Sequence, residues 1–374
     1  MALALLLLPH YNSFAGQTRC RLASADHVPA AQALRRDRLA RHSVRQGQSM
    51  VITVPAGRAD EGLRPVDAAR DMPQVIELLK LVFGEAIEID DRQFLSEVPG
   101  APIDGLFSRF NPSSARLANG FVWQADGRVV ANVTLLATKV RDRYLVANVA
   151  VHPDYRRQGI AHALMQATTS AVKKRGGRAI LLQVVKDNYP AIDLYRDLGY
   201  VSVGHMTTWY APASRLRQLE LDGGEHEIRP LSGRRWREAY ELDTACVPAD
   251  LNWPEPLRHD AYRLSIWQRL GDVLNGRQQE AWAVVDARER LAGLATVSGQ
   301  WGRSYLATLR VRRDWTGRLE RPLLAKVIRR LGYLPRRNVR IDHPDDDVLT
   351  NELLREANFA VQRTLTHMRL DLSR

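Results

Sequence analysis

A turn between an apolar strand and a helix has residue types suited to binding an anion. The strand ends in Val149-Ala150-Val151, and the turn Arg156-Arg157-Gln158-Gly159-Ile160-Ala161 leads into an apolar-patterned helix. The first backbone N–H groups of a helix have no acceptor within the helix, so they can converge on an anion. Gly159 and Ala161 leave these groups accessible because their side chains are small, and the two arginines add positive charge. The segment therefore predicts a phosphate-binding turn.

The turn matches neither of two common phosphate-binding patterns. A Walker loop would end in Gly-Lys-Ser/Thr, and a dinucleotide fold would show Gly-x-Gly-x-x-Gly after a strand. The turn resembles instead the motif of the GNAT N-acetyltransferases, Arg/Gln-x-x-Gly-x-Gly/Ala, with Gly159 and Ala161 in register. Residues on both sides extend the resemblance over positions 149 to 200. They are Val-Ala-Val-x-Pro-x-Tyr-Arg-Arg before the glycine and Asn188-x-x-Ala191-x-x-Leu194-Tyr195-x-x-x-Gly199-Tyr200 after it.

This resemblance implies a site for acetyl-coenzyme A as the co-substrate, without a metal. In the family, the strand backbone pairs with the pantetheine arm, the turn and helix start hold the pyrophosphate, and an Asn of the next element reaches the cofactor. Carried over residue by residue, the expected cofactor-binding residues are Val149, Ala150, Val151, Arg156, Arg157, Gln158, Gly159, Ile160, Ala161 and Asn188.

Asn188 and Tyr195 each have a second explanation. Asn188 is equally well placed to cap the helix that Pro190 opens. Tyr195 resembles the general acid of the family, which meets the departing thiol, and it is the expected catalytic residue. It would alternatively be a core aromatic residue with a satisfied hydroxyl group.

The base that accepts a proton from the amine is missing from its usual place. An alkylamine with a pKa near 10 is only about one part in a thousand unprotonated at pH 7, so a base or a desolvating pocket is required. Many relatives have a Glu on the strand before the motif, and Ala147 stands there in this sequence. Two routes stay open: a water relayed to another carboxylate, or an amine that arrives deprotonated.

An acidic stretch between Gly84 and Gly105 bears on the acceptor. It contains a single basic residue, Arg92, and its acids are Glu85, Glu88, Asp90, Asp91, Glu97 and Asp104. In GNAT domains this part of the chain usually borders the acceptor site, where acids would attract a cationic amine. An ordinary solvated loop would explain the same residues.

Three functions are considered. The favoured one is transfer of an acetyl group to a primary amine of a small molecule or aminoglycoside-like cation. The alternatives are acetylation of a peptide amino terminus or lysine, and a non-catalytic acyl-coenzyme A sensor.

The apolar periodicity alternates between helix and strand around the motif. Helices are predicted over Asp71 to Phe83, Ile160 to Arg175 and Pro190 to Leu198. Strands are predicted over Phe121 to Gln124, Val129 to Ala137, Leu145 to Val151, Arg178 to Val185 and Val201 to Tyr210. This order predicts an α/β fold in which a twisted mixed sheet has helices on both faces.

The pattern repeats at an offset of about 160 residues, which predicts two tandem GNAT-like domains. Tyr144-Leu145 leading to Val151 is echoed by Tyr305-Leu306 leading to Val311, and His205-Met206 by His367-Met368. In the second copy Leu319 replaces Gly159 and would fill the phosphate position, and Leu354 stands roughly at Tyr195. The expected organisation is a disordered or spurious extension (1–49), a catalytic domain (50–212), a linker (213–225) and a degenerate domain (226–374).

The composition of the chain indicates which classes of binding partner are not expected. No run of 18 apolar residues occurs, so no membrane partner is expected. The net charge of +12 includes five charges from the first 49 residues, and the other basic residues are dispersed among acids, which argues against nucleic-acid binding. Cys20 and Cys246 are too few for a disulfide framework, which fits a cytoplasmic protein. The second domain would serve packing, closure of the acceptor cleft, or formation of a homodimer.

Overall fold

The computed structural model describes residues 61–97, 120–220, 226–252, 256–263, 277–300 and 304–372, without the side chains of 85–97, 277, 278 and 300. The expected extension 1–49, the acidic side chains between Gly84 and Gly105, and residues 221–225 of the expected linker lie outside this description. In the described part of the chain, no helix is both long and apolar enough to cross a membrane.

The first half of the chain, residues 61–220, contains every element that the periodicity predicts. Its strands are β1 (Gly62–Pro65), β2 (Gly120–Ala125), β3 (Arg128–Ala137), β4 (Arg143–Val151), β5 (Ala179–Val185) and β6 (Val201–Pro212). Its helices are α1 (Ala68–Glu97), α3 (Ile160–Lys174) and α4 (Tyr189–Asp197). The helix predicted over Asp71 to Phe83 thus continues to Glu97. Strands β2 and β3 form the predicted hairpin, and both turn residues, Asp126 and Gly127, have the positive φ that such a tight turn requires.

Helices cover both faces of this sheet. Leu164 and Met165 of α3 and Ile192 of α4 pack with strand residues on one face. Leu78 and Leu79 of α1 pack on the opposite face. Burying an apolar stripe of each helix against the sheet is what makes this layered arrangement stable.

The second half, residues 226–372, repeats the order of elements. Its strands are β7 (Arg229–Pro230), β8 (Arg277–Val285), β9 (Leu291–Gln300), β10 (Tyr305–Val311), β11 (Asn338–Pro344) and β12 (Ala360–Asp371). Its helices are α5 (Trp236–Cys246), α7 (Glu320–Leu331) and α8 (Val348–Glu356). Helices α7 and α8 pack in one apolar cluster and α5 in another, as α3, α4 and α1 do in the first half.

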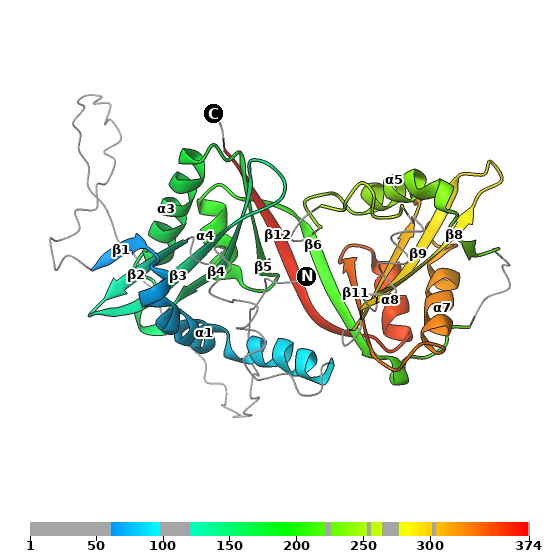
Figure 1. The fold of residues 1–374 in the computed structure, drawn as a ribbon, viewed down its shortest axis with the longest axis horizontal. Coiled ribbons are helices and arrows are strands. Elements are labelled where there is room, and N and C mark those ends of the chain that lie inside the picture. The colour runs from blue at the N-terminus through cyan, green and yellow to red at the C-terminus, as the bar shows by residue number, and fades with distance from the viewer. Residues whose placement is uncertain are drawn as a thin grey trace, which may run out of the picture. The chain divides into compact units, whose positions relative to one another are not determined.

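The two halves exchange their last strands, which the sequence did not predict. Strand β12 lies between β5 and β6, and β6 also pairs with β11, so one sheet of 12 strands runs through both halves (Figure 1). Met368 of β12 is therefore buried in the core of the first half, and Trp209 of β6 in the core of the second. The exchange pairs strand edges that would otherwise be open, and open edges favour aggregation.

A buried hydrogen-bonded chain ties the second half to β5. His367 Nδ1 lies 3.2 Å from the carbonyl oxygen of Asp250, and His367 Nε2 lies 2.7 Å from Gln183 Nε2. Because a carbonyl oxygen can only accept, Nδ1 holds the proton and Nε2 accepts from the Gln183 amide. The Asp250 carboxylate also pairs with Arg369 and Arg143. Burial lowers the pKa of His367 to about 4.

Truncating Met368 should destabilise both halves together. Met368→Ala removes a fully buried side chain and should lower the free energy of unfolding by about 2–5 kcal/mol. Urea denaturation followed by fluorescence and circular dichroism should show a single transition, because β12 belongs to both packing units. The control is Val361→Ala on the same strand, where the side chain is 48% exposed, with an expected loss of less than about 1 kcal/mol. Two separate transitions in the unchanged protein would contradict this coupling.

Acid should destabilise the protein partly through His367. Its folded-state pKa lies below the reference value of about 6.5, so the unfolded chain binds the proton more tightly. The stability associated with the neutral ring is complete above pH 6.5 and is lost as the pH falls toward 4, by roughly 3 kcal/mol. Unfolding free energies of His367→Gln, measured from pH 7.5 to pH 4, should fall less steeply than those of the unchanged protein. Parallel curves would show that His367 does not carry this dependence.

Candidate cofactor site

Strands β4 and β5 separate toward their carboxyl ends. Their parallel pairing joins only Arg143–Leu145 to Ala179–Leu181. Beyond these residues β5 still pairs with β12 and β4 with β3, so the gap lies between β4 and β5 alone. Among the residues that the structure describes, the backbone of Val146–Val151 therefore has no strand partner on the side of the gap. An edge of this kind can accept an extended ligand as an additional strand.

A β-bulge shapes β4 where it borders the gap. Asn132 pairs with Ala150 and Thr134 with Ala147, so a single residue of β3 faces two residues of β4, Asn148 and Val149. Asn148 has a φ of 54°, in the left-handed region. A bulge redirects backbone groups at the inserted residue. The strand predicted to bind pantetheine is thus irregular at the point where it faces the gap.

The predicted phosphate turn opens the start of α3. Arg157 and Gly159 have φ values of 59° and 77°. Gly159 is the N-cap of α3 and provides no capping side chain, and a Cβ atom placed on it would meet no atom within 4 Å. Ala163 N–H makes the first helical bond, to the oxygen of Gly159, so the N–H groups of residues 160 to 162 have no helical acceptor. Glycine is needed here for its backbone conformation, and the space beside it is open to a ligand.

The other turn residues divide between anchoring and exposure. Ile160 is buried in the core and fixes the start of the helix. Arg156 Nε donates to the oxygen of Val151 at 3.2 Å, and the side chains of Arg156, Arg157 and Gln158 are exposed. The turn thus combines N–H groups that lack a helical acceptor with the exposed side chains of Arg156 and Arg157. Both features suit a diphosphate. Within the described ranges, no group of three or more His, Cys, Asp or Glu residues is placed to hold a metal ion.

Asn188 and Tyr195 lie on α4. Asn188 caps this helix, and its Oδ1 accepts from Ala191 N–H at 3.4 Å. Tyr195 is buried in the cluster against which Val149 and Val151 also pack, so the structure brings it together with the edge strand of the gap. Its ring lies 5.9 Å from that of Tyr200, centroid to centroid. Burial raises the pKa of Tyr195, so its hydroxyl stays protonated at neutral pH and is suited to donate a hydrogen bond.

The equivalent turn of the second half is occupied by the protein itself. Glu320 Oε2 accepts from the N–H groups of Gly317 at 2.9 Å and Leu319 at 3.2 Å. Leu319, at the position of Gly159, is fully buried. Strand β10 pairs with β9 without a change of register, so it lacks the bulge of β4. The start of α7 therefore holds a carboxylate in place of an external anion.

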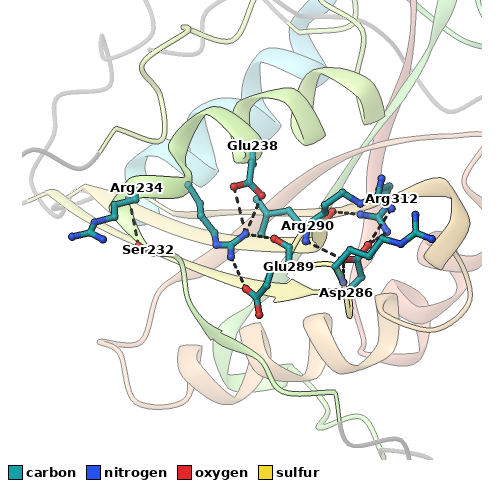
Figure 2. Close-up of polar contacts among 10 residues, drawn as sticks. Ser232, Arg234, Glu238, Asp286, Glu289, Arg290 and Arg312 are labelled. Carbon is teal, nitrogen blue, oxygen red and sulfur yellow. Dashed lines mark hydrogen bonds and ion pairs between the residues drawn. The ribbon is translucent and has the colours of Figure 1, made fainter.

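A group of ion pairs lies around the end of β10 and the turn between β8 and β9 (Figure 2). Arg312, the residue after β10, pairs with Asp286 at 2.7 Å and donates to the oxygen of Leu291. The backbone N–H of Arg290 and the side chain of Arg312 donate hydrogen bonds to Asp286, the Arg290 side chain also pairs with it, and these contacts hold the pKa of Asp286 well below its usual range. Arg235 forms ion pairs with Glu289, in the turn between β8 and β9, and with Glu238 of α5. These contacts join the β8–β9 turn to the elements around it.

Asn132, Gln183 and His367 are polar residues near the gap that the sequence motif did not indicate. One signal for the bulge was present in the repeat. Tyr144 and Tyr305 are 161 residues apart, whereas Val151 and Val311 are 160 apart, so the first copy contains one additional residue between them. Strand pairing places this additional residue at Asn148 and Val149.

Comparison with known proteins agrees with this geometry. Residues 86–200 match the model of the Acetyltransferase (GNAT) family. The N-alpha-acetyltransferase of Sulfurisphaera tokodaii is 36% identical over 103 residues, which are 24% of this chain and 61% of that protein. The ribosomal protein bS18-alanine N-acetyltransferase of Escherichia coli K12 is 41% identical over 61 residues, 16% of this chain and 41% of that protein. The chain thus spans less than two thirds of the length of either relative.

A solved structure extends the similarity in fold to both halves. The GCN5-related N-acetyltransferase from Sphaerobacter thermophilus aligns with 83% of this chain and 95% of its own, with a TM-score of 0.55 and 18% sequence identity. The matched family model places residues 86–200 in a GNAT acetyltransferase domain, and the repeated order of elements and the solved structure show a fold of two tandem GNAT-like halves.

Proposed function

We propose that this protein transfers an acetyl group from acetyl-coenzyme A to a primary amine. One observation carries the proposal: in the first half, the uncapped start of α3 opens beside the unpaired edge of β4. The first feature suits a diphosphate and the second an extended amide chain, and coenzyme A contains both.

In the second half, a carboxylate of the protein itself binds to the turn that corresponds to the proposed diphosphate site. The Glu320 carboxylate accepts two backbone N–H bonds at the start of α7, which corresponds to the start of α3. This contact supports the expectation that a turn of this shape binds an anion through its N–H groups. In the first half, Ile160 stands at the position of Glu320 and points into the core, so no carboxylate competes there.

The residues of the first half fit coenzyme A in three places. The N–H groups of residues 160 to 162, with Arg156 and Arg157, would hold the phosphates. The edge of Val149–Val151 would pair with the pantetheine amides, and its N–H groups would polarise the thioester carbonyl. When bound, acetyl-coenzyme A supplies the activated acetyl group.

Tyr195 would stabilise the departing sulfur through a hydrogen bond. The amine nitrogen forms a bond to the thioester carbon, the C–S bond breaks, and the amine proton leaves to solvent. Complete transfer of the Tyr195 proton to a thiolate with a reference pKa near 8.5 would be uphill, because burial raises the pKa of Tyr195 above its ordinary value of about 10. Donation without transfer is therefore the role that fits the buried hydroxyl.

Two acceptor classes are supported by different observations. The names of the relatives favour the α-amino group of a peptide or protein. The acidic stretch Glu85 to Asp104 favours a small cationic amine. Ala147 offers no base, so we propose that the amine reacts after losing its proton, and the rate should then rise with pH toward the pKa of the acceptor.

The second half is proposed to have lost its own cofactor site. Glu320 accepts from the N–H groups of the turn before α7, Leu319 is buried at the position of Gly159, and Leu354 stands where Tyr195 stands in the first half. Its proposed role is to complete the sheet of the catalytic half through β12.

The two phosphate turns provide a matched pair of variants. Gly159→Val and Gly317→Val should cost similar stability, because both glycines have positive φ and neither Cβ would meet another atom. Gly159→Val alone should weaken acetyl-coenzyme A binding, about tenfold or more, because displacing the phosphate loses at least one charge-assisted hydrogen bond. Isothermal calorimetry measures this difference. Equal weakening by the two variants would place the site elsewhere.

Thiol release with a panel of amines tests the reaction itself. Acetyl-coenzyme A would be incubated with peptides that have free amino termini and with small cationic amines. Tyr195→Phe should lower the rate about 10²-fold or more while binding is retained, if the hydroxyl donates a hydrogen bond to the developing thiolate. Tyr200→Phe is the control, because this tyrosine is buried in the same cluster. Binding without release for every acceptor would instead support a sensor, and absence of binding would refute the proposed function.

A further inference from the structure

Asn132 of β3 holds the bulge of β4 through a buried hydrogen bond. Asn132 Nδ2 donates to the backbone oxygen of Asn148 at 2.9 Å, and its side chain is almost completely buried. The Asn148 side chain is fixed in turn, because its Nδ2 lies 3.4 Å from Thr134 Oγ1. These contacts anchor the left-handed residue from the β3 side, the side of β4 remote from the gap.

Peptide planarity carries this anchor to the neighbouring N–H group. The oxygen of Asn148 and the N–H of Val149 belong to one peptide group, and in a trans peptide they point in opposite directions. Because the oxygen of Asn148 is directed to the Asn132 amide, the Val149 N–H points away from that amide. The strand on the other side of β4 is β5, from which β4 has separated at this level. The gap therefore lies on the side of β4 away from Asn132.

The second half has the same arrangement of strands but lacks both the buried amide and the bulge. Leu294 stands at the position of Asn132, since it pairs with Arg310 as Asn132 pairs with Ala150. The strand β10 that it faces has no bulge. The buried amide and the bulge are therefore present together in the first half and absent together in the second.

We infer that Asn132 is a positioning residue that aims the Val149 N–H at the thioester carbonyl of acetyl-coenzyme A. The inference rests on the proposed function. Asn132 touches no substrate: it fixes one peptide plane, and that plane presents the donor. A donor fixed before the reaction stabilises the developing oxyanion without a cost of reorganisation.

The test compares acetyl-coenzyme A with coenzyme A, which lacks the acetyl carbonyl. Asn132→Leu removes the amide and keeps a side chain that branches at the same atom. Calorimetry should show acetyl-coenzyme A binding weakened about 3- to 10-fold, as expected for one hydrogen bond, and coenzyme A binding changed less than about 2-fold. The infrared band of acetyl-coenzyme A labelled with ¹³C at the carbonyl should shift to higher frequency in the variant, because the carbonyl has lost a donor.

Two further variants separate this role from general stability. Thr168→Val removes another buried hydrogen bond, to the oxygen of Leu164 in α3, and should leave the band unchanged. Asn132→Asp keeps the shape but places a carboxylate against the Asn148 oxygen. Protonation of that carboxylate would restore a donor. The carbonyl band of acetyl-coenzyme A bound to Asn132→Asp should therefore return toward its position in the unchanged protein as the pH falls.

The outcomes are distinguishable. If the unchanged protein binds neither ligand, the proposed function fails and this inference fails with it. Suppose instead that the unchanged protein binds both acetyl-coenzyme A and coenzyme A. If folded Asn132→Leu then shows an unshifted carbonyl band, or loses affinity for the two ligands equally, only the inference about Asn132 is overturned. If Asn132→Leu does not fold, an Asn132→Asp band that is independent of pH overturns it.

Discussion

The pairing between β4 and β5 stops after Leu145 and Leu181, and the site depends on this separation. Two parallel strands that stayed paired would use their N–H and C=O groups on each other. Where they part, β4 keeps its bonds to β3 and presents a second set of backbone groups to the gap. The turn after β4 then delivers the chain to α3, whose uncapped N-terminus faces open space at Gly159. One strand end thus places the proposed diphosphate site and the edge proposed to pair with the pantetheine amides next to each other.

The second half shows which local features differ from the proposed cofactor site on the same scaffold. Strands β10 and β11 pair in parallel over only three positions, as β4 and β5 do. The difference lies in local residues. Without the additional residue of the bulge, β10 stays in register with β9, and Glu320 accepts from the N–H groups of Gly317 and Leu319 in the turn before α7. Burial raises the pKa of Glu320, yet the two N–H donors favour its charged form. Fold and cofactor site are separable properties here.

The sequence predicted the local parts of this structure better than the long-range ones. The helix and strand order around Gly159 followed from periodicity, because each element has its own apolar repeat. The N-cap at Asn188 followed from local backbone chemistry. The exchange of β6 and β12 did not, because an apolar alternation shows which face is buried and does not identify the neighbouring strand. Asn132 was missed for the same reason: it is an ordinary strand residue until strand pairing brings it to Asn148, 16 positions away. The cofactor contacts and domain limits remain predictions.

The exchanged strand gives a physical reason for keeping the second half, which we propose has lost its own cofactor site. If β12 were deleted, β5 would lose its only partner beside the gap and Gln183 would lose His367. The edge of β5 would then be free to pair with β4 and close the separation, or with another molecule. Mutations that fill the second phosphate turn leave β12 in place, so they do not disturb the first half. Selection on the first site would therefore preserve the fold and the last strand of the second half while its own turn is free to change. The buried Leu319 and the self-satisfied turn at Glu320 are the pattern that this argument predicts.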